Sequence, residues 1–422
     1  MRPLLEGAGP ASLADVANRY ATTVQRVLRA WVESRTTDDD VRWLDLLLRR
    51  ELLGNRLNLS PRLQTLAEAY RRTEQELASP RVVPGIADSG SSIEQPVFIR
   101  GDCHRPGETV PRRFLEVLAN SRDGYLGQGS GRLELADRIA SPTNPLTARV
   151  LVNRVWHHLF GTGLVRTVDD FGHVGDLPSH PELLDHLATQ FMRDGWSMKR
   201  LIRSIVLTRT FQQSSSQASA HAREVDPQNR FLWHYPARRM EAEAIRDSIL
   251  STSGRLDQAL FGTSVQPFRD RENADRRLFP GPLDGNGRRS VYIKNNLMEA
   301  PRFLEAFNFP GGKVTQGRRD STNVPAQALA LLNDPFVQEQ ADVWAARLIV
   351  NASDSVESRI ESMFMSGLGR TPTSEERQRF TQAVMQFADL EHVPPADVLK
   401  NQLVWKDIAH AVFNLKEFIF IQ

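Results

Sequence analysis

The fold is decided by residues 144–188, which read NPLTARVLVNRVWHHLFGTGLVRTVDDFGHVGDLPSHPELLDHLA, two helical patterns joined by a polar loop rich in glycine. Asn144 is a favoured N-cap residue, and Pro145 suits the first position of a helix. Two adjacent apolar stripes then recur at helical spacing until Gly161, a residue suited to the left-handed conformation that ends many helices. Stripes on two neighbouring faces predict a helix that is buried on more than one side.

The second pattern of this stretch starts at Ser179, and Glu182 three residues later completes a capping box. Apolar residues at helical spacing follow until Gly195, and a third helical pattern runs from Ser197 to Leu207. Helices joined by such short links pack against one another. We therefore expect three packed helices in the middle of the chain.

Helical periodicity also dominates on both sides of this stretch. Upstream, it predicts a hairpin over residues 13–53 and a helix over 60–77, before a linker rich in proline, glycine and serine over 79–92. Further helices are predicted over residues 130–139, 236–253, 325–332, from 335 onward, 373–390 and 395–413. Two β-rich segments, 96–100 and 290–295, could pair in a minor sheet. The predicted fold class is mainly α, a multi-helix bundle with a minor β element.

Length and composition limit the class of protein. With 422 residues and 40% hydrophobic content, the chain is long enough for two or three globular units. No apolar run approaches the roughly 20 residues of a transmembrane helix, and the N-terminal residues lack the pattern of a secretion signal. The single cysteine, Cys103, excludes an internal disulfide, a site built from several cysteines and a CxxCH haem attachment. Its neighbours Asp102 and His104 point elsewhere on an extended stretch, so an activated thiol is the less favoured alternative.

The basic residues are unusual in kind. Only six of the 53 basic side chains are lysines, which leaves 47 arginines, although the net charge is only +2. Guanidinium groups bind carboxylates, phosphates and sulfates through two parallel hydrogen bonds, so a polyanionic glycan is one possible partner. The alternative is a GC-rich genome that encodes arginine in place of lysine, which the even scatter of the arginines favours. No basic stripe typical of nucleic-acid binding is present.

The loop between the first two central helices holds the candidate catalytic residues Asp170, His173 and His180. Carboxylate and imidazole groups can serve as general acid and base, and together with Asp176 they could hold a divalent cation. In the alternative interpretation, these polar side chains shape turns at glycines and the start of a helix. The spacing matches no HExxH motif, EF-hand or pair of histidines on one helix face, so no metal is expected.

A second polar constellation follows the 290–295 segment. Its candidate anion-binding residues are Lys294, Arg318, Arg319 and Asp320, set between a predicted strand and a helix N-terminus. The alternative is that Arg319 and Asp320 form a structural ion pair. If the two constellations meet in one concave pocket, an enzyme is favoured, and dispersed loops favour a scaffold.

Five motifs carry a resemblance to a known family. NPLTARVLVNRVWHHLFGTGLV, DDFGHVGDLPSHPELLDHLA, RRMEAEAIRDSIL, GRRDSTNVPAQALALLNDPFV and WKDIAHAVFNLKEFIF together resemble the planctomycete surface domain family, domain of unknown function 1553. The similarity extends from about residue 132 to the C-terminus. Residues 13–77, with the RGDCHRPGETVPRRFL stretch, resemble the C-terminal part of the companion planctomycete cytochrome-associated domain, domain of unknown function 1549.

The resemblance implies three regions: a helical tail of the companion domain (1–90), a connecting segment with a short strand (91–131) and a helical domain similar to the planctomycete surface domain (132–422). Such domains belong to large exported proteins that often carry cytochrome c domains, so a cytochrome c domain or another envelope protein is the implied partner. Haem c would lie on a separate domain, and no cofactor is expected within this chain. Because the chain shows neither an export signal nor a haem motif, we expect a fragment of a longer protein and leave its localisation open. The family has no settled catalytic residues to transfer.

These observations favour a non-catalytic helical binding or scaffold module of the bacterial cell envelope. The alternative is a hydrolase or redox enzyme that acts on complex carbohydrate, with Asp170, His173 and His180 facing Arg318, Arg319 and Asp320.

Overall fold

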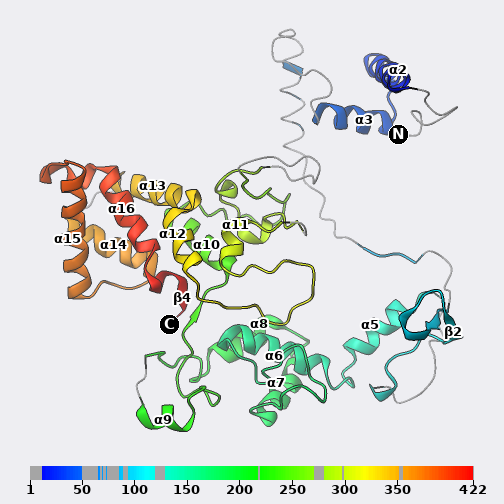
Figure 1. Cartoon of the computed structure of the whole chain (residues 1–422), viewed down its shortest axis with the longest axis horizontal. Coiled ribbons are helices and arrows are strands. Elements are labelled where there is room, and N and C mark those ends of the chain that lie inside the picture. Colours follow the sequence, from blue (N-terminus) through cyan, green and yellow to red (C-terminus); the bar gives the residue numbers. More distant parts are fainter. Residues whose placement is uncertain are drawn as a thin grey trace. The chain divides into compact units, whose positions relative to one another are not determined.

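The computed structural model describes residues 12–49, 65–66, 69, 73, 85–88, 94–118, 129–216, 219–269, 280–296, 299–350 and 355–421. These residues are mostly helical, with two small antiparallel sheets of two strands each (Figure 1). The prediction of a mainly α fold is therefore confirmed. The chain divides into two compact units, Met1–Arg81 and Val82–Gln422. None of the described helices combines the length and apolar character that a membrane span requires.

The first unit contains the predicted helical hairpin, formed by α2 (Leu13–Val32) and α3 (Asp38–Arg49). The rings of Tyr20 and Trp43 lie 5.4 Å apart between the two helices. At the start of α3, the backbone N–H of Asp40 donates to the Thr37 hydroxyl and the Asp40 carboxylate accepts from the Thr37 N–H. This reciprocal cap satisfies two donors that a helix start leaves without a partner. Most of the predicted helix 60–77 and linker 79–92 lies outside the described residues.

The sheets differ from the predicted pairing. β1 (Pro96–Phe98) pairs with β2 (Pro106–Thr109), and residues 290–292 form the 3-10 turn η4 (Ser290–Tyr292). The predicted sheet between 96–100 and 290–295 is therefore wrong. Arg100 and Gly101, in the 3-10 turn η1 (Ile99–Gly101), have positive φ angles of 57° and 80° that help the chain reverse direction at once. A hairpin partner a few residues away closes a much shorter loop than a distant strand would.

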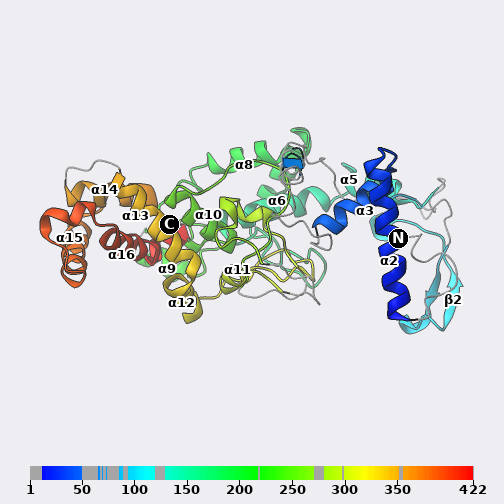
Figure 2. The ribbon, with the colours of Figure 1, turned by 90° about the horizontal axis from the view of Figure 1, so that it is seen from above.

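Helices α5 (Arg132–Ala140), α6 (Thr147–Phe160), α7 (Pro181–Arg193) and α8 (Met198–Val206) follow in order, and the last three lie together in Figures 1 and 2. Their shared core is formed by Val152, Trp156, Phe160, Leu184, Phe191 and Ile205, with Tyr235 packed against it. The Tyr235 hydroxyl donates to the Leu159 carbonyl oxygen at 2.9 Å. The expected three-helix nucleus is therefore present.

Two predicted helix starts shift by one to two residues. The Asn144 side chain accepts from the backbone N–H of Leu146 at 3.0 Å, so it closes a turn and α6 begins only at Thr147. The N-cap of α7 is His180 and not Ser179, because Pro181 occupies the first helical position that proline favours. In contrast, Ser197 caps α8 and Gly161 ends α6 in the left-handed conformation, as predicted.

The second core lies among the C-terminal helices, where Trp344 of α13 (Pro335–Val350) packs on Phe413 of α16 (Gln402–Phe413) with ring centroids 5.2 Å apart. The other helices of this region are α10 (Ala242–Ser253), α11 (Arg302–Ala306), α12 (Pro325–Asn333), α14 (Val356–Leu368) and α15 (Ser374–Leu390). Other short elements of the second unit are α9 (Ala220–Val225), η2 (Glu116–Leu118), η3 (Gly285–Gly287), η5 (Pro395–Lys400) and η6 (Lys416–Ile419).

Two of the predicted C-terminal helices begin later than expected. Residues 236–241 precede α10 and include β3 (Arg238–Arg239), which pairs with β4 (Phe420–Ile421). The predicted helix 395–413 is divided into η5 and α16 because Asn401 caps the second part and accepts from the Val404 N–H at 3.1 Å. The predicted helices from 335 onward and over 373–390 are present, and each has a side-chain cap. Asp334 accepts from the Phe336 N–H at 2.9 Å at the start of α13, and Thr373 with Glu376 forms a capping box at the start of α15.

A bridge of ion pairs ties α15 to the C-terminal segment. Arg370 donates to both carboxylate oxygens of Glu376 and of Glu417 at 2.6–2.8 Å. The guanidinium of Arg370 lowers the pKa of Glu376 to about 2, from an ordinary value of 4.5. Because the folded-state pKa is depressed, this interaction stabilises the fold above the ordinary pKa and is lost as the pH falls toward 2.

The free energy of unfolding should therefore decrease as the pH falls from about 6 to about 3, and Glu376→Gln should flatten this part of the profile. Urea denaturation at several pH values measures it. The control is Glu375→Gln, whose pair with Arg379 is exposed to solvent and should contribute little. An unchanged slope in Glu376→Gln would contradict the assignment.

Candidate functional site

The polar loop between α6 and α7 is held by a buried amide. The Asn153 side chain, 0% exposed, donates to the Val165 carbonyl oxygen and accepts from the Val165 N–H, both at 2.9 Å. Gly163 lies so close to this amide that a Cβ atom there would meet Asn153 Oδ1 at 2.8 Å. These contacts fix the course of the backbone between the end of α6 and Val165.

Beyond Val165 the loop is closed by turns centred on Asp170. The Thr167 hydroxyl donates to the Asp170 carbonyl oxygen, and Asp170 Oδ1 accepts from the Gly172 N–H, each at 2.8 Å. The Thr167 hydroxyl also accepts from the Asp176 N–H at 2.9 Å. The Asp170 carboxylate thus shapes a turn, as in the structural alternative.

The histidines predicted beside it have separate surroundings. His173 is exposed, while half-buried His180 contacts the Ser179 hydroxyl at 3.0 Å and packs edge-on against Phe231. Within the described residues, no hydrogen bond or ion pair joins Asp170, His173 and His180. The same part of the chain holds no group of three histidine, cysteine or acidic side chains placed to bind a metal.

The second constellation pairs with α10. Arg319 donates to both carboxylate oxygens of Glu243 and lies 3.2 Å from Glu241. The hydrogen bonds that Arg319 donates to Glu243 are the main cause that raises the pKa of Arg319. The partner of Arg319 is therefore not Asp320, which is exposed. Lys294 is also exposed, and its backbone N–H donates to Val265.

The two constellations meet at Asp169. Asp169 Oδ2 accepts from the backbone N–H of Gly317 at 2.8 Å, across 148 residues of sequence, and Arg154 of α6 lies 3.8 Å from Asp169 Oδ1. Gly317 is buried, and a Cβ atom at this position would meet Asp169 Oδ1 at 2.0 Å. Only glycine lets the two segments approach this closely.

Around this contact, basic and acidic side chains from four segments gather, and we call the group the arginine junction. It comprises Arg154, His157, His158, Asp169, Arg238, Glu241, Glu243, Arg318 and Arg319. Sequence reasoning missed Arg154, Arg238, Glu241 and Glu243 as site residues. A signal existed in part, because Arg154 and His158 lie one turn apart on a helix whose other faces are apolar.

The junction holds four arginines and three carboxylates, so positive charge is in slight excess. Burial is the main cause that lowers the pKa of His157, and positive charge on His158, Arg238 and Arg318 lowers it further. His158, whose Nδ1 lies 3.6 Å from Glu241 Oε1, is the main cause that lowers the pKa of Glu241. The Nε–H groups of Arg154 and Arg238 are buried and have no hydrogen-bond partner in the described part of the chain. Such donors favour an anionic acceptor.

These features define a mainly helical protein with a polar arginine-rich junction between two apolar cores. The chain matches the family described as PSD1, protein of unknown function (DUF1553), over residues 131–384, and it belongs to that family. No curated protein and no solved structure matches it.

The contact between Asp169 and Gly317 makes a stability prediction. Asp169→Ala should lower the free energy of unfolding by about 1–3 kcal/mol because it removes a charge-assisted hydrogen bond to a buried N–H. Gly317→Ala should cost about as much, through overlap with the carboxylate. The double variant should lose less than the sum, because Asp169→Ala removes the overlapping atoms. Strict additivity in chemical denaturation would show that the two residues do not touch.

Proposed function

We propose that the chain is a binding module whose arginine junction holds the sulfate or carboxylate groups of a polyanionic glycan. The observation that carries the proposal is the pair of buried Nε–H groups on Arg154 and Arg238, which find no hydrogen-bond partner among the residues that the structure describes. Arg318 of the same junction is exposed. A guanidinium presents donors in a planar fork that matches a carboxylate or sulfate. A bound anion would supply the acceptors that these groups lack.

The pattern of charge supports a glycan over a nucleic acid. Asp169, Glu241 and Glu243 alternate with the cations, so positive potential is confined to a small area. A nucleic acid carries closely spaced phosphates and binds extended basic surfaces, whose affinity depends on many phosphate contacts. Isolated anionic groups on a sugar chain suit a local cationic site better.

The surroundings of the candidate catalytic residues support binding over catalysis. The Asp170 carboxylate accepts within its own turn, and His180 packs on Phe231. A hydrolase acting on glycans ordinarily places two carboxyl groups about 5–9 Å apart across a cleft. We propose that the module acts as a scaffold beside another domain of a longer envelope protein, with residues 13–77 belonging to the cytochrome-associated companion domain.

Binding to dextran sulfate tests the proposal, with unsulfated dextran as the neutral comparison. Dextran sulfate should bind in calorimetry at low ionic strength and weaken with added salt, because the contacts are ionic. Arg318→Gln should weaken binding about tenfold, which corresponds to about 1.4 kcal/mol for one lost ionic contact. Since Arg318 is exposed, its replacement should leave the thermal midpoint unchanged.

The matched control is Arg379→Gln on α15, which removes an equal charge from a side chain that is 75% exposed. It should bind dextran sulfate like the wild type. Equal losses in Arg318→Gln and Arg379→Gln would indicate nonspecific attraction to the whole chain and would overturn the proposal. So would equal binding of dextran and dextran sulfate.

Affinity for the sulfated probe should also depend on pH. His157 faces His158, Arg238, Arg318 and Glu241, and its lowered pKa keeps it neutral near pH 7. A bound anion favours the protonated ring, so affinity should rise as the pH falls below the ordinary value of 6.5. His157→Gln should remove most of this rise between about pH 7 and pH 5. A pH-independent wild type would contradict the placement of the anion beside His157.

A further inference from the structure

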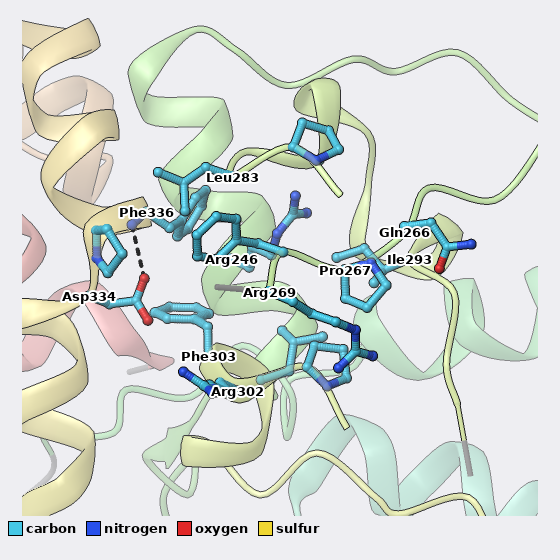
Figure 3. A pocket seen from close by; sticks show the side chains of 16 residues that line it. Arg246, Gln266, Pro267, Arg269, Leu283, Ile293, Arg302, Phe303, Asp334 and Phe336 are labelled. Carbon is cyan, nitrogen blue, oxygen red and sulfur yellow. Dashed lines mark hydrogen bonds between the residues drawn. The ribbon is translucent and has the colours of Figure 1, made fainter. Parts of the chain in front are cut away.

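A separate pocket lies between α10, α11, α13 and the loops at residues 266–269 and 282–293 (Figure 3). Its cavity volume is about 110 Å³. None of the residues that line it belongs to the arginine junction. The pocket therefore needs its own explanation.

Most of its wall is apolar. Phe303 from α11 and Phe336 from α13 form one side, and Pro267 and Ile293 lie on the opposite side in Figure 3. Leu283 borders the cavity next to Phe336. An apolar surface offers few hydrogen bonds to replace the hydration of an inorganic ion. It favours a ligand with a hydrocarbon part, whose burial is stabilising.

Four charged residues interrupt the apolar wall: Arg302, which is exposed, Asp334, and the two buried cations Arg246 and Arg269. Arg246 of α10 is 4% exposed and donates to the carbonyl oxygens of Asp284 and Arg288 at 2.6 and 2.9 Å. Its nearest carboxylate oxygen belongs to Asp247, 3.7 Å away. Burial lowers the pKa of Arg246 only to about 10, so the guanidinium stays charged at neutral pH. The charged guanidinium of Arg246 therefore donates mainly to neutral carbonyl oxygens.

The second cation, Arg269, has a side chain that is 7% exposed. Its Nη1 donates to Glu299 Oε1 at 2.7 Å, while its Nε–H is buried and finds no acceptor among the residues described. A buried donor without an acceptor destabilises the fold, because it has lost its hydrogen bond to water and gained none in return. The pocket thus contains both empty space and a donor that lacks an acceptor.

We propose that this pocket binds a small organic carboxylate with a compact apolar body. One carboxylate oxygen accepts from Arg269 Nε–H, and the hydrocarbon part lies against Phe303 and Phe336. A cavity of about 150 Å³ accommodates benzene, so this smaller one of about 110 Å³ fits about four non-hydrogen atoms, enough for the hydrocarbon part of propionate or isobutyrate with the carboxylate placed at Arg269. A neutral hydrocarbon would leave the Arg269 donor without an acceptor, and a charged acceptor forms the stronger hydrogen bond.

Isobutyrate is the probe, and isobutyramide, which has the same shape without the charge, is the comparison. Saturation-transfer NMR and calorimetry on the full chain should show saturable binding of isobutyrate, at least tenfold tighter than that of isobutyramide. Saturating isobutyrate should also raise the thermal midpoint. Equal binding of the two compounds, or no saturable binding of isobutyrate, would overturn the proposal.

Two variants test the two features of the site separately. Arg269→Lys keeps the charge and an ion pair with Glu299 but removes the Nε–H, so isobutyrate binding should fall at least tenfold. Leu283→Phe fills the cavity and should abolish binding while leaving both arginines in place. Circular dichroism and the thermal midpoint check that each variant folds. Wild-type affinity in two folded variants would contradict the proposal.

This inference does not rest on the proposed glycan function, and one competition experiment separates them. Dextran sulfate at saturating concentration should leave the isobutyrate affinity unchanged, because the pocket shares no lining residue with the junction. Loss of isobutyrate binding in the presence of dextran sulfate would place the carboxylate at the junction and overturn the pocket assignment. Failure of dextran sulfate to bind would leave the isobutyrate result standing.

Discussion

The buried amide of Asn153 is the constraint on which the polar half of the molecule depends. Both of its polar atoms are satisfied by the backbone of Val165, so rotating the side chain would leave two buried groups without partners. These two hydrogen bonds therefore attach the backbone of the loop at Val165 directly to α6. From this point, only a few residues and one turn separate the chain from Asp169. The position of Asp169, and with it the contact between Asp169 and Gly317, is therefore set by the packing of α6 in its core.

Local signals predicted the elements that local forces decide. Ser197 caps α8 and Thr373 with Glu376 caps α15, because a side chain and a backbone N–H three residues apart make these bonds whatever surrounds them. Ser179 failed as a cap because Pro181 set the start of α7 by a stronger backbone restriction. Signals of this kind gave most of the helices and the mainly α class.

The junction could be predicted only in part, because its contacts join distant segments. The sequence pointed to Arg318 and Arg319, but the partners of Arg319 lie some 76 residues upstream at the start of α10. No periodicity links positions so far apart, and the strand β3 that helps to place Arg238 depends on pairing with β4 at the end of the chain. The sequence identified the kinds of side chain present, and tertiary packing determined which of them meet.

Helix α10 contributes side chains to both the junction and the separate pocket. Even so, we expect ligand binding at one site to leave the affinity of the other unchanged. Glu243 faces Arg319 at the junction, and Arg246, one turn later, lines the pocket. Between them, Ile245 is fully buried in the C-terminal core. Coupling between two sites requires an element with two arrangements of similar free energy, whose balance each ligand shifts. A short helix anchored by close-packed side chains has no second arrangement to occupy without opening a cavity. The shared helix therefore positions both groups of side chains while keeping their binding equilibria separate.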